Sequence, residues 1–215
     1  MNDYQVWEIA GHTLEYLDDI HQYIVDGIMV SSVTESLKMK FGNKYASVDR
    51  ETLQRASERG TEVHETIEKY FTEGRESDLQ ELRNFKFLQK KYGFEVVGNE
   101  LPVILFDGVI DTKPIFNADK PILAGRFDLL LDFDGKYALG DIKTTSTLDK
   151  EYLGLQLNIY KIACMQCYEV NIELLKGIHL RGDTRKIIDI PVNEQMAWDY
   201  ITEWRIKRHE YFEKC

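Results

Sequence analysis

The spacing of hydrophobic residues predicts four amphipathic helices. Apolar or small residues recur every three or four positions from about Arg50 to Phe71, which predicts a long helix with Asp49 as its N-cap. The same spacing predicts helices at about Asp78–Tyr92, Asp149–Cys167 and Asn193–Phe212. The apolar stripe of the long helix from Arg50 to Phe71 consists of Leu53, Ala56, Gly60, Val63, Ile67 and Phe71.

Extended segments lie between the helices. Residues 94–106, 122–133 and 136–145 are rich in β-branched and aromatic residues, which are typical of strands. Shorter strands are expected near Glu173–Leu180 and Lys186–Ile190. The order of elements is helices, a meander of strands, then helix, strands and helix. It predicts a mixed α/β or α+β domain in which a central mixed sheet is flanked by helices.

The N-terminal region has its own turn and cap signals. Two apolar runs, HQYIV and IMVSSV, flank Asp26 and Gly27, and an Asp-Gly pair in that setting favours a two-residue hairpin turn. Ser32 and Glu35 have the spacing of a capping box ahead of a short helix that ends at Lys40. We therefore expect a hairpin followed by a helix.

The composition is that of an ordinary globular protein. The 215 residues are 43% hydrophobic and 30% charged, enough to bury a sizeable core. We expect a single domain over residues 1–215, with the hairpin and helix as an extension at about residues 1–45. Without an apolar run long enough for a membrane or a visible secretory signal, we expect a cytoplasmic protein and no membrane partner. The odd number of cysteines, three, favours a reducing compartment.

The charge balance limits how the chain could meet a nucleic acid. With 27 basic and 37 acidic residues the net charge is −10, which argues against coating nucleic acid with the whole surface. A local basic groove remains open, although basic clusters are most often solvated helix faces. The clusters are Arg50, Arg55 and Arg59; Arg83, Lys86, Lys90 and Lys91; Arg181, Arg185 and Lys186; and Arg205, Lys207 and Arg208.

Two of the central strands each carry an aspartate where an apolar residue is expected. An Asp-Gly turn at residues 134–135 would pair Phe133 with Lys136, and counting back along both strands then pairs Asp128 with Asp141. A symmetric four-residue loop gives the same pairing, whereas a three-residue loop with a bulge shifts it by one position.

Strand alternation places these acids on one face with a lysine. That face carries Asp128, Asp141 and Lys143, and Arg126 lies opposite Lys143. Like charges paired about 5 Å apart at Cβ are destabilising, so one acid must have a raised pKa or the pair must hold a cation such as Mg²⁺. The alternative is an edge strand whose solvated acids and lysine discourage further pairing. The other face carries Phe127, Leu129, Leu131, Phe133, Ala138 and Ile142.

Further polar residues lie among apolar neighbours. His64 lies in the stripe of the long helix, where it is either a packed core residue or a metal ligand that completes a carboxylate site. Glu68, one turn later, is either part of that site or solvated. Gln156 and Tyr160 share one face of a later helix, and the amide needs a partner, such as the strand lysine or a DNA backbone. Glu100 is expected to approach from a neighbouring strand.

These segments resemble motifs of the PD-(D/E)XK nuclease superfamily. Within it they are most similar to the RecB-like branch, which includes phage exonucleases, CRISPR-adaptation nucleases and a mitochondrial genome-maintenance exonuclease. The N-terminal hairpin and the SVTE segment also resemble phage-encoded members. The resemblance spans about Gly27–Tyr160; each motif alone is weak, but four in the right order are specific. The motifs are GTEVH ending at His64, GRFD ending at Asp128, GDIKTT with Asp141 and Lys143, and QLNIY from Gln156 to Tyr160.

The resemblance implies a restriction-endonuclease-like core and a metal-dependent deoxyribonuclease. It implies His64, Asp128 and Asp141 as ligands of one or two Mg²⁺ or Mn²⁺ ions, and Lys143 as the residue that positions or activates the attacking water. The implied role is that of an exonuclease in recombination, replication or repair, in a host cytoplasm if the protein is phage-encoded. DNA is the implied partner, together with a single-strand annealing or other recombination protein. Supporting or DNA-binding roles fall to Gln156, Tyr160, Glu100, Glu68 and Arg126.

Two departures from the family pattern bear on these expectations. The strand before the first aspartate reads GRFD rather than a literal Pro-Asp. Some RecB-like nucleases hold an iron–sulfur cluster with one upstream cysteine, but no cysteine precedes Cys164 here, so we expect no cluster. We interpret Cys164, Cys167 and Cys215 as packing residues. Two alternatives stay open: a non-catalytic DNA- or protein-binding module on a nuclease scaffold, and a structure-specific endonuclease.

Overall fold

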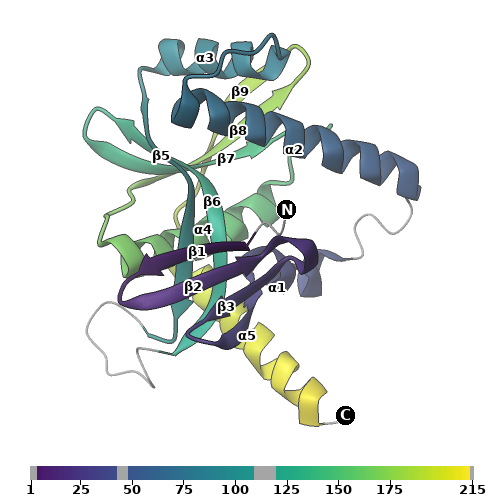
Figure 1. Ribbon diagram of the computed structural model, residues 1–215, viewed down its shortest axis with the longest axis vertical. Coiled ribbons are helices and arrows are strands. Elements are labelled where there is room, and N and C mark those ends of the chain that lie inside the picture. Colours follow the sequence, from purple (N-terminus) through teal and green to yellow (C-terminus); the bar gives the residue numbers. More distant parts are fainter. Residues whose placement is uncertain (1–3, 43–47, 109–119, 214–215) are drawn as a thin grey trace.

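The computed structural model describes residues 4–42, 48–108 and 120–213, which form a mixed sheet flanked by helices (Figure 1). The strands are β1 (Tyr4–Ile9), β2 (His12–Leu17), β3 (Gln22–Val25), β4 (Ile28–Ser32), β5 (Glu95–Phe106), β6 (Pro121–Phe133), β7 (Lys136–Lys143), β8 (Leu174–Arg181) and β9 (Thr184–Ile190). The helices are the short 3₁₀ helix η1 (Asp18–Ile20), α1 (Val33–Phe41), α2 (Arg50–Glu73), α3 (Gln80–Tyr92), α4 (Lys150–Tyr168) and α5 (Glu194–Glu213). None of the helices in the described part of the chain is long and apolar enough to cross a membrane.

Strand β6 has three partners and organises the sheet. One edge of β6 pairs antiparallel with β5 along most of its length. The other edge pairs first with β4, in parallel at Leu123 and Ala124, and further on with β7, antiparallel from Leu129 to Phe133. Among the described residues, no strand pairs with residues 125–128 on this second edge. The sheet is therefore open between β4 and β7.

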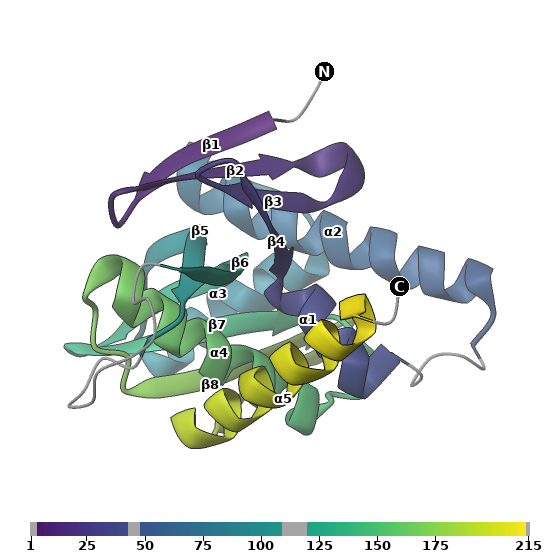
Figure 2. The ribbon, with the colours of Figure 1, turned by 90° about the horizontal axis from the view of Figure 1, so that it is seen from below.

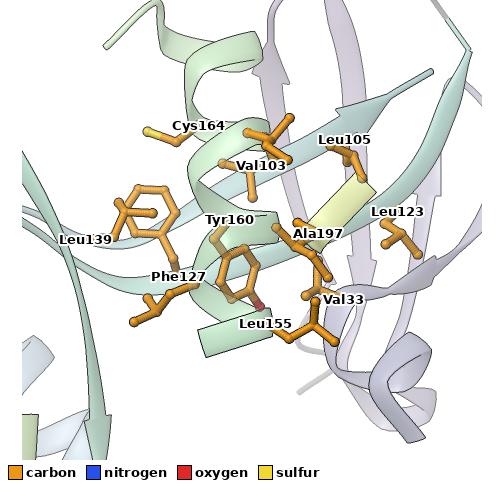
Figure 3. Close-up of a cluster of buried hydrophobic side chains, with 14 of the residues drawn as sticks. Val33, Val103, Leu105, Leu123, Phe127, Leu139, Leu155, Tyr160, Cys164 and Ala197 are labelled. Carbon is orange, nitrogen blue, oxygen red and sulfur yellow. The ribbon is translucent and has the colours of Figure 1, made fainter. Parts of the chain in front are cut away.

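Helices cover both faces of the sheet. Helices α4 and α5, with α1, pack on one face around a core that includes Phe127, Leu139 and Tyr160 (Figure 3). Helices α2 and α3 pack on the other face, where Val63 and Phe85 meet the inner side chains of β6 to β8. The N-terminal strands pack through a third cluster against β5 and β6 (Figure 2). The opening in the sheet thus lies between the two helical layers and next to the N-terminal strands.

The predicted helix caps are confirmed. The Asp49 carboxylate accepts a hydrogen bond from the Thr52 amide at 2.8 Å and begins α2. Ser32 Oγ accepts from the Glu35 amide at 2.9 Å and begins α1. A third cap, which is not predicted from the sequence, is Asp149, whose carboxylate accepts from two amides in the first turn of α4. Because each cap satisfies backbone donors that the helix leaves free, these residues fix where each helix begins.

Both predicted Asp-Gly turns are confirmed. Asp26 and Gly27 have φ values of 49° and 78°, and Asp134 and Gly135 have φ values of 55° and 85°. Positive φ at both central residues is the geometry of the hairpin turn whose twist matches the adjoining strands. The turn at 134–135 therefore sets the β6–β7 register that the sequence predicts.

The N-terminal hairpin is larger than predicted. Strands β1 and β2 precede it and form a second hairpin through Ala10 and Gly11, whose φ values are 52° and 81°. An Ala-Gly pair is a weaker turn signal than Asp-Gly because alanine rarely adopts positive φ. The region over Tyr4–Phe41 is thus a four-stranded meander followed by α1.

Two predicted burial patterns are wrong. In α2 only Val63 and Ile67 are buried, and Leu53 is 38% exposed because the first half of the helix extends beyond the sheet (Figure 1). Phe127 does not share a cluster with Leu129 but packs on the α4 side of the sheet, 6.3 Å from Tyr160 between ring centroids. Phe127 lies in the segment of β6 that is paired with β5 on one edge but no longer with β7 on the other.

Candidate active site

The two strands separate where the two aspartates would have paired. The register follows the prediction as far as Leu129 and Gly140, which form the last backbone pair, one position short of Asp128 and Asp141. Beyond it, the Ile142 amide donates a hydrogen bond to Asp128 Oδ2 at 2.6 Å. The two acids are therefore not a cross-strand backbone pair, and a carboxylate takes the place that the next β6 carbonyl would have occupied.

His64 of α2 contacts the same residue of β7. Its Nε2 lies 3.0 Å from the Ile142 carbonyl oxygen, so this nitrogen carries the proton and donates it to the carbonyl. Nδ1 lies 3.6 Å from Glu100 Oε1 and 3.6 Å from Asp128 Oδ2. A histidine that ligates a metal usually donates its other N–H to a backbone carbonyl or carboxylate, which fixes the tautomer. Nδ1 is thus the nitrogen oriented for a ligand.

Three side chains from three elements converge beside this histidine. Ligand atoms of His64, Glu100 and Asp128 all lie within 4.8 Å of one another. Glu100 lies on β5 directly across from Asp128, since Asn99 pairs with Leu129 and Leu101 pairs with Phe127. Glu100 has φ of 47°, a left-handed conformation that non-glycine residues seldom adopt.

Asp141 lies next to this group and is paired with Lys143. Lys143 Nζ is 2.6 Å from Asp141 Oδ2, donates to Oδ1 at 2.8 Å and lies 3.4 Å from the buried Gln156 Oε1 on α4. Despite this ion pair, Asp141 Oδ2 is buried and has no well-oriented hydrogen bond among the described residues. The predicted set of His64, Asp128 and Asp141 is therefore divided: the first two lie with Glu100, and the third lies with the lysine.

Burial and mutual repulsion shift the ionisation of the acids. Burial raises the pKa of Asp141 to about 6, with the Asp128 charge adding to the effect and Lys143 opposing it. Burial also raises the pKa of Asp128. For His64, burial lowers the pKa, but the charges of Asp128, Glu100 and Asp141 outweigh it and raise the pKa to about 9. The site concentrates negative charge that a cation would stabilise.

The donor set fits a divalent cation. Two carboxylates and an imidazole face one another, and the buried carboxylate of Asp141, paired with Lys143, lies beside them. Carboxylate oxygens suit Mg²⁺ and Mn²⁺, and a neutral imidazole adds preference for a transition metal such as Mn²⁺.

The structure places Arg126 and Glu68 around the group rather than in it. Arg126 Nε lies 3.8 Å from Glu100 Oε2, and its guanidinium donates to Gln5 Oε1 at 3.1 Å and lies 5.4 Å from the Tyr16 ring centre. Arg126 thus links Glu100 to the N-terminal strands. The prediction that Arg126 lies opposite Lys143 is wrong, because the pairing of β6 with β7 ends at Leu129 and Gly140. Glu68 is half-buried, and burial followed by the charge of Glu100 raises its pKa.

Tyr160 fills the opening in the sheet from the α4 side. It is 4% exposed, and a Cβ atom placed on Gly125 of β6 would lie 2.9 Å from Tyr160 Cε1 and 3.0 Å from its hydroxyl. Only glycine permits this approach. Tyr160 therefore packs closely against the β6 segment that leads to Asp128, beside Phe127 (Figure 3).

A mixed sheet opens beside a strand that carries Asp-x-Lys, with further acids at the opening, which agrees with the nuclease core that the sequence motifs resemble. Residues 45–177 match the PD-(D/E)XK nuclease superfamily, and the chain belongs to this superfamily. Membership implies hydrolysis of nucleic acid, with DNA as the substrate and a divalent metal as the usual cofactor.

Other comparisons add less. No curated protein matches the chain. Sixteen chains of solved structures match. One, described as the crystal structure of SSO0001, is 15% identical to this chain, and the match covers 82% of this chain and 75% of that chain with a TM-score of 0.46.

Proposed function

We propose that this nuclease is a Mg²⁺- or Mn²⁺-dependent DNA exonuclease of the RecB-like branch, acting in recombination, replication or repair. The observation that carries the catalytic part is the group formed by His64, Glu100 and Asp128, whose ligand atoms lie within 4.8 Å of one another. The Asp141–Lys143 pair next to it supplies a further acid and a buried ammonium. This combination serves phosphodiester hydrolysis better than simple DNA binding, which needs no buried acids.

We assign the metal to His64 Nδ1, Glu100 and Asp128, with Asp141 as the fourth candidate ligand. When bound, a divalent ion supplies Lewis-acid polarisation of the phosphate, a nucleophilic water at neutral pH and neutralisation of developing charge. The Ile142 amide and carbonyl orient Asp128 and His64 from the opposite side.

Lys143 is assigned to the reacting phosphate. Its ammonium has a raised pKa: burial lowers the value, but Asp141 and Asp128 outweigh burial, so it stays charged. A fixed positive charge at this position stabilises negative charge that builds up on phosphate oxygens. Gln156 Oε1, 3.4 Å from Nζ, limits where the ammonium can lie. Gln156 is therefore a positioning residue in this proposal.

The four motifs lie on four different elements, in the order that RecB-like nucleases have. GTEVH lies on α2, GRFD on β6, GDIK on β7 and QLNIY on α4. Their similarity to RecB-like and phage-encoded members supports exonuclease action and a partner such as a single-strand annealing or other recombination protein. The same similarity supports the cytoplasm, or a host cytoplasm, as the site of action.

Cleavage of labelled DNA of defined form tests the proposal. With Mn²⁺ or Mg²⁺, linear DNA should be degraded from its ends, while covalently closed circles should persist. Lys143→Ala should lose at least a hundredfold in rate, whereas Lys176→Ala, which removes a lysine paired with Asp189 on the neighbouring strands, should not. Cutting of closed circles, or of branched DNA alone, would show that the protein is an endonuclease rather than an exonuclease. A folded protein that binds DNA without cutting any form would be a binding module.

A further inference from the structure

A second feature of the site lies next to Lys143. A cavity of about 440 Å³ opens between α1 and the start of α4, and Lys143 forms part of its lining. Its volume falls within the range of about 300–1,000 Å³ that is typical of small-molecule sites. The same ammonium therefore borders both the acids and this cavity.

The cavity walls combine aromatic, hydroxyl and cationic groups with the carboxylate of Asp149. Phe41 and Tyr152 line it and pack edge to face, with ring centroids 5.3 Å apart. Leu37 adds a buried apolar surface, and Lys38 lines the cavity together with Lys143. Aromatic faces suit the flat apolar faces of a nucleobase, and the two ammonium groups suit the phosphates on either side of it.

The surrounding contacts hold the walls in place. Lys40 of α1 forms an ion pair at 2.7 Å with Glu151 of α4, and the Tyr200 hydroxyl of α5 donates to the Ser36 carbonyl of α1 at 2.6 Å. The cavity is therefore a feature of the packed helices. The amides that begin α4 are engaged by the Asp149 carboxylate, so the start of this helix does not serve as a phosphate site. Positive charge in the lining comes from the lysines.

We propose that this cavity receives one unpaired nucleobase of the strand being cut, from the nucleotide next to the scissile phosphate. The inference rests on the proposed nuclease function, because a phosphate at Lys143 would be joined to the nucleoside inside the cavity. A cavity of about 440 Å³ with two aromatic rings and two lysines in its lining has room for a single base rather than a base pair. The substrate end is therefore single-stranded at the site, and a duplex end has to fray before it is cut.

An abasic scan tests the cavity directly. A single abasic residue is moved along a single-stranded oligonucleotide, and the rate of cleavage by the natural chain is compared with that of Phe41→Ala. Base stacking on an aromatic side chain contributes about 1–3 kcal/mol, so one position should slow the natural chain about fivefold or more. In Phe41→Ala the same abasic position should have less than a twofold effect, because the base no longer has its partner ring.

Two further variants separate stacking from folding. Phe41→Leu keeps apolar volume but removes the ring and should behave like Phe41→Ala. Met39→Ala changes the same helix but lines a different cavity beside α5, and it should keep the full abasic effect. Melting curves identify any variant that does not fold. Equal abasic effects in the natural chain and both Phe41 variants would overturn the inference, as would the absence of any sensitive position.

A metal-free binding measurement distinguishes failure of this inference from failure of the nuclease proposal. The fluorescent base 2-aminopurine, placed at each position in turn and bound with EDTA present, should be quenched at one position by the natural chain but not by Phe41→Leu. Quenching without cleavage of any DNA would retain the base site and reject the nuclease. Cleavage with neither quenching nor abasic sensitivity would retain the nuclease and reject the base site.

Discussion

The Ile142 amide donates to the Asp128 carboxylate at 2.6 Å at the point where β7 loses its backbone pairing with β6. On the other side of the same residue, the Ile142 carbonyl faces His64 Nε2 at 3.0 Å. One residue of β7 therefore orients two candidate metal ligands from two different elements. The site therefore lies at the open edge of the sheet. The amide and the carbonyl of Ile142, which no longer pair with β6, bond instead to the side chains of Asp128 and His64.

This relationship predicts that Asp128→Asn and Asp128→Ala differ in stability but not in activity. Asparagine keeps an oxygen that accepts from Ile142 and removes a buried charge, so Asp128→Asn should unfold at the same or higher urea concentration than the natural metal-free chain. Alanine leaves the amide unpaired, which costs about 1–3 kcal/mol in the free energy of unfolding. Both variants should lose cleavage. Equal unfolding midpoints for the two variants would show that this hydrogen bond contributes little.

Metal binding should strengthen as the pH rises from 6 to 8. A divalent ion competes with protons on His64, whose pKa is raised to about 9, and on Asp141, whose pKa is raised to about 6. Between those values one proton is displaced, so the Mn²⁺ dissociation constant should fall about tenfold per pH unit, and more steeply below pH 6. Calorimetric titration with Mn²⁺ at pH 6, 7 and 8 measures this. His64→Ala should bind more weakly and lose most of the dependence above pH 6.

The stability of the metal-free protein should have the opposite pH dependence. Asp141 and His64 both have pKa values above their ordinary 3.8 and 6.5, so their protonated forms are favoured by folding. Their contribution to stability is present at low pH. It is lost as the pH rises through about 6 for Asp141 and about 9 for His64. The difference in melting temperature with and without Mn²⁺ should therefore widen from pH 6 to pH 8, and a constant difference would contradict the assigned ligands.

The sequence predicts most of this frame because local signals define it. Asp134 and Gly135 specify the hairpin, the hairpin sets the register, and the register brings residues 128 and 141 to the same level of the sheet. Strand periodicity cannot predict where a ladder ends, since that depends on which other elements reach the strand. Here β4 and β7 share one edge of β6 and leave residues 125–128 between them.

Glu100 shows which part of the candidate site the sequence left open. The resemblance implies Asp141 as a metal ligand and gives Glu100 a supporting role. In the structure the carboxylate of Glu100 lies with His64 and Asp128, while Asp141 lies beside them, paired with Lys143. The polar run Gly98-Asn99-Glu100 inside an apolar strand was the available signal. Its meaning depends on the pairing of β5 with β6, which places Glu100 across from Asp128 and which periodicity alone does not specify.

Arg126 should influence metal affinity through Glu100. Arg126→Ala removes the cation 3.8 Å from Glu100 Oε2 and should raise the Mn²⁺ dissociation constant about tenfold, as is usual when a residue that orients a ligand is lost. Gln5→Ala is the matched control, since it removes the other hydrogen-bond partner of Arg126 but leaves the contact with Glu100. Calorimetry on both variants measures the effect. An unchanged dissociation constant in Arg126→Ala would show that Glu100 is held by its backbone alone.

The approach of Tyr160 to Gly125 predicts a sharp difference between two glycine substitutions. Gly125→Ala would place a methyl group 2.9 Å from the Tyr160 ring, and forcing an extra carbon into a packed core costs about 1–3 kcal/mol. Gly154→Ala on α4 meets its nearest neighbour, Ile190, at 3.8 Å, so the better helix propensity of alanine should stabilise the protein by up to about 1 kcal/mol. Urea unfolding of both variants tests this contrast.

The same pair allows the clash to be assigned to a single contact. In a double-mutant cycle, Tyr160→Leu removes the ring, so Gly125→Ala should cost at least about 1 kcal/mol less in that background than in the natural chain. Tyr160→Phe keeps the ring edge, so the cost of Gly125→Ala in that background should stay close to its cost in the natural chain. If the cost of Gly125→Ala is the same in all three backgrounds, the penalty comes from the β6 backbone rather than from Tyr160. Because β6 leads from Gly125 directly to Asp128, Gly125→Ala should also lower cleavage in proportion to the displacement of that carboxylate.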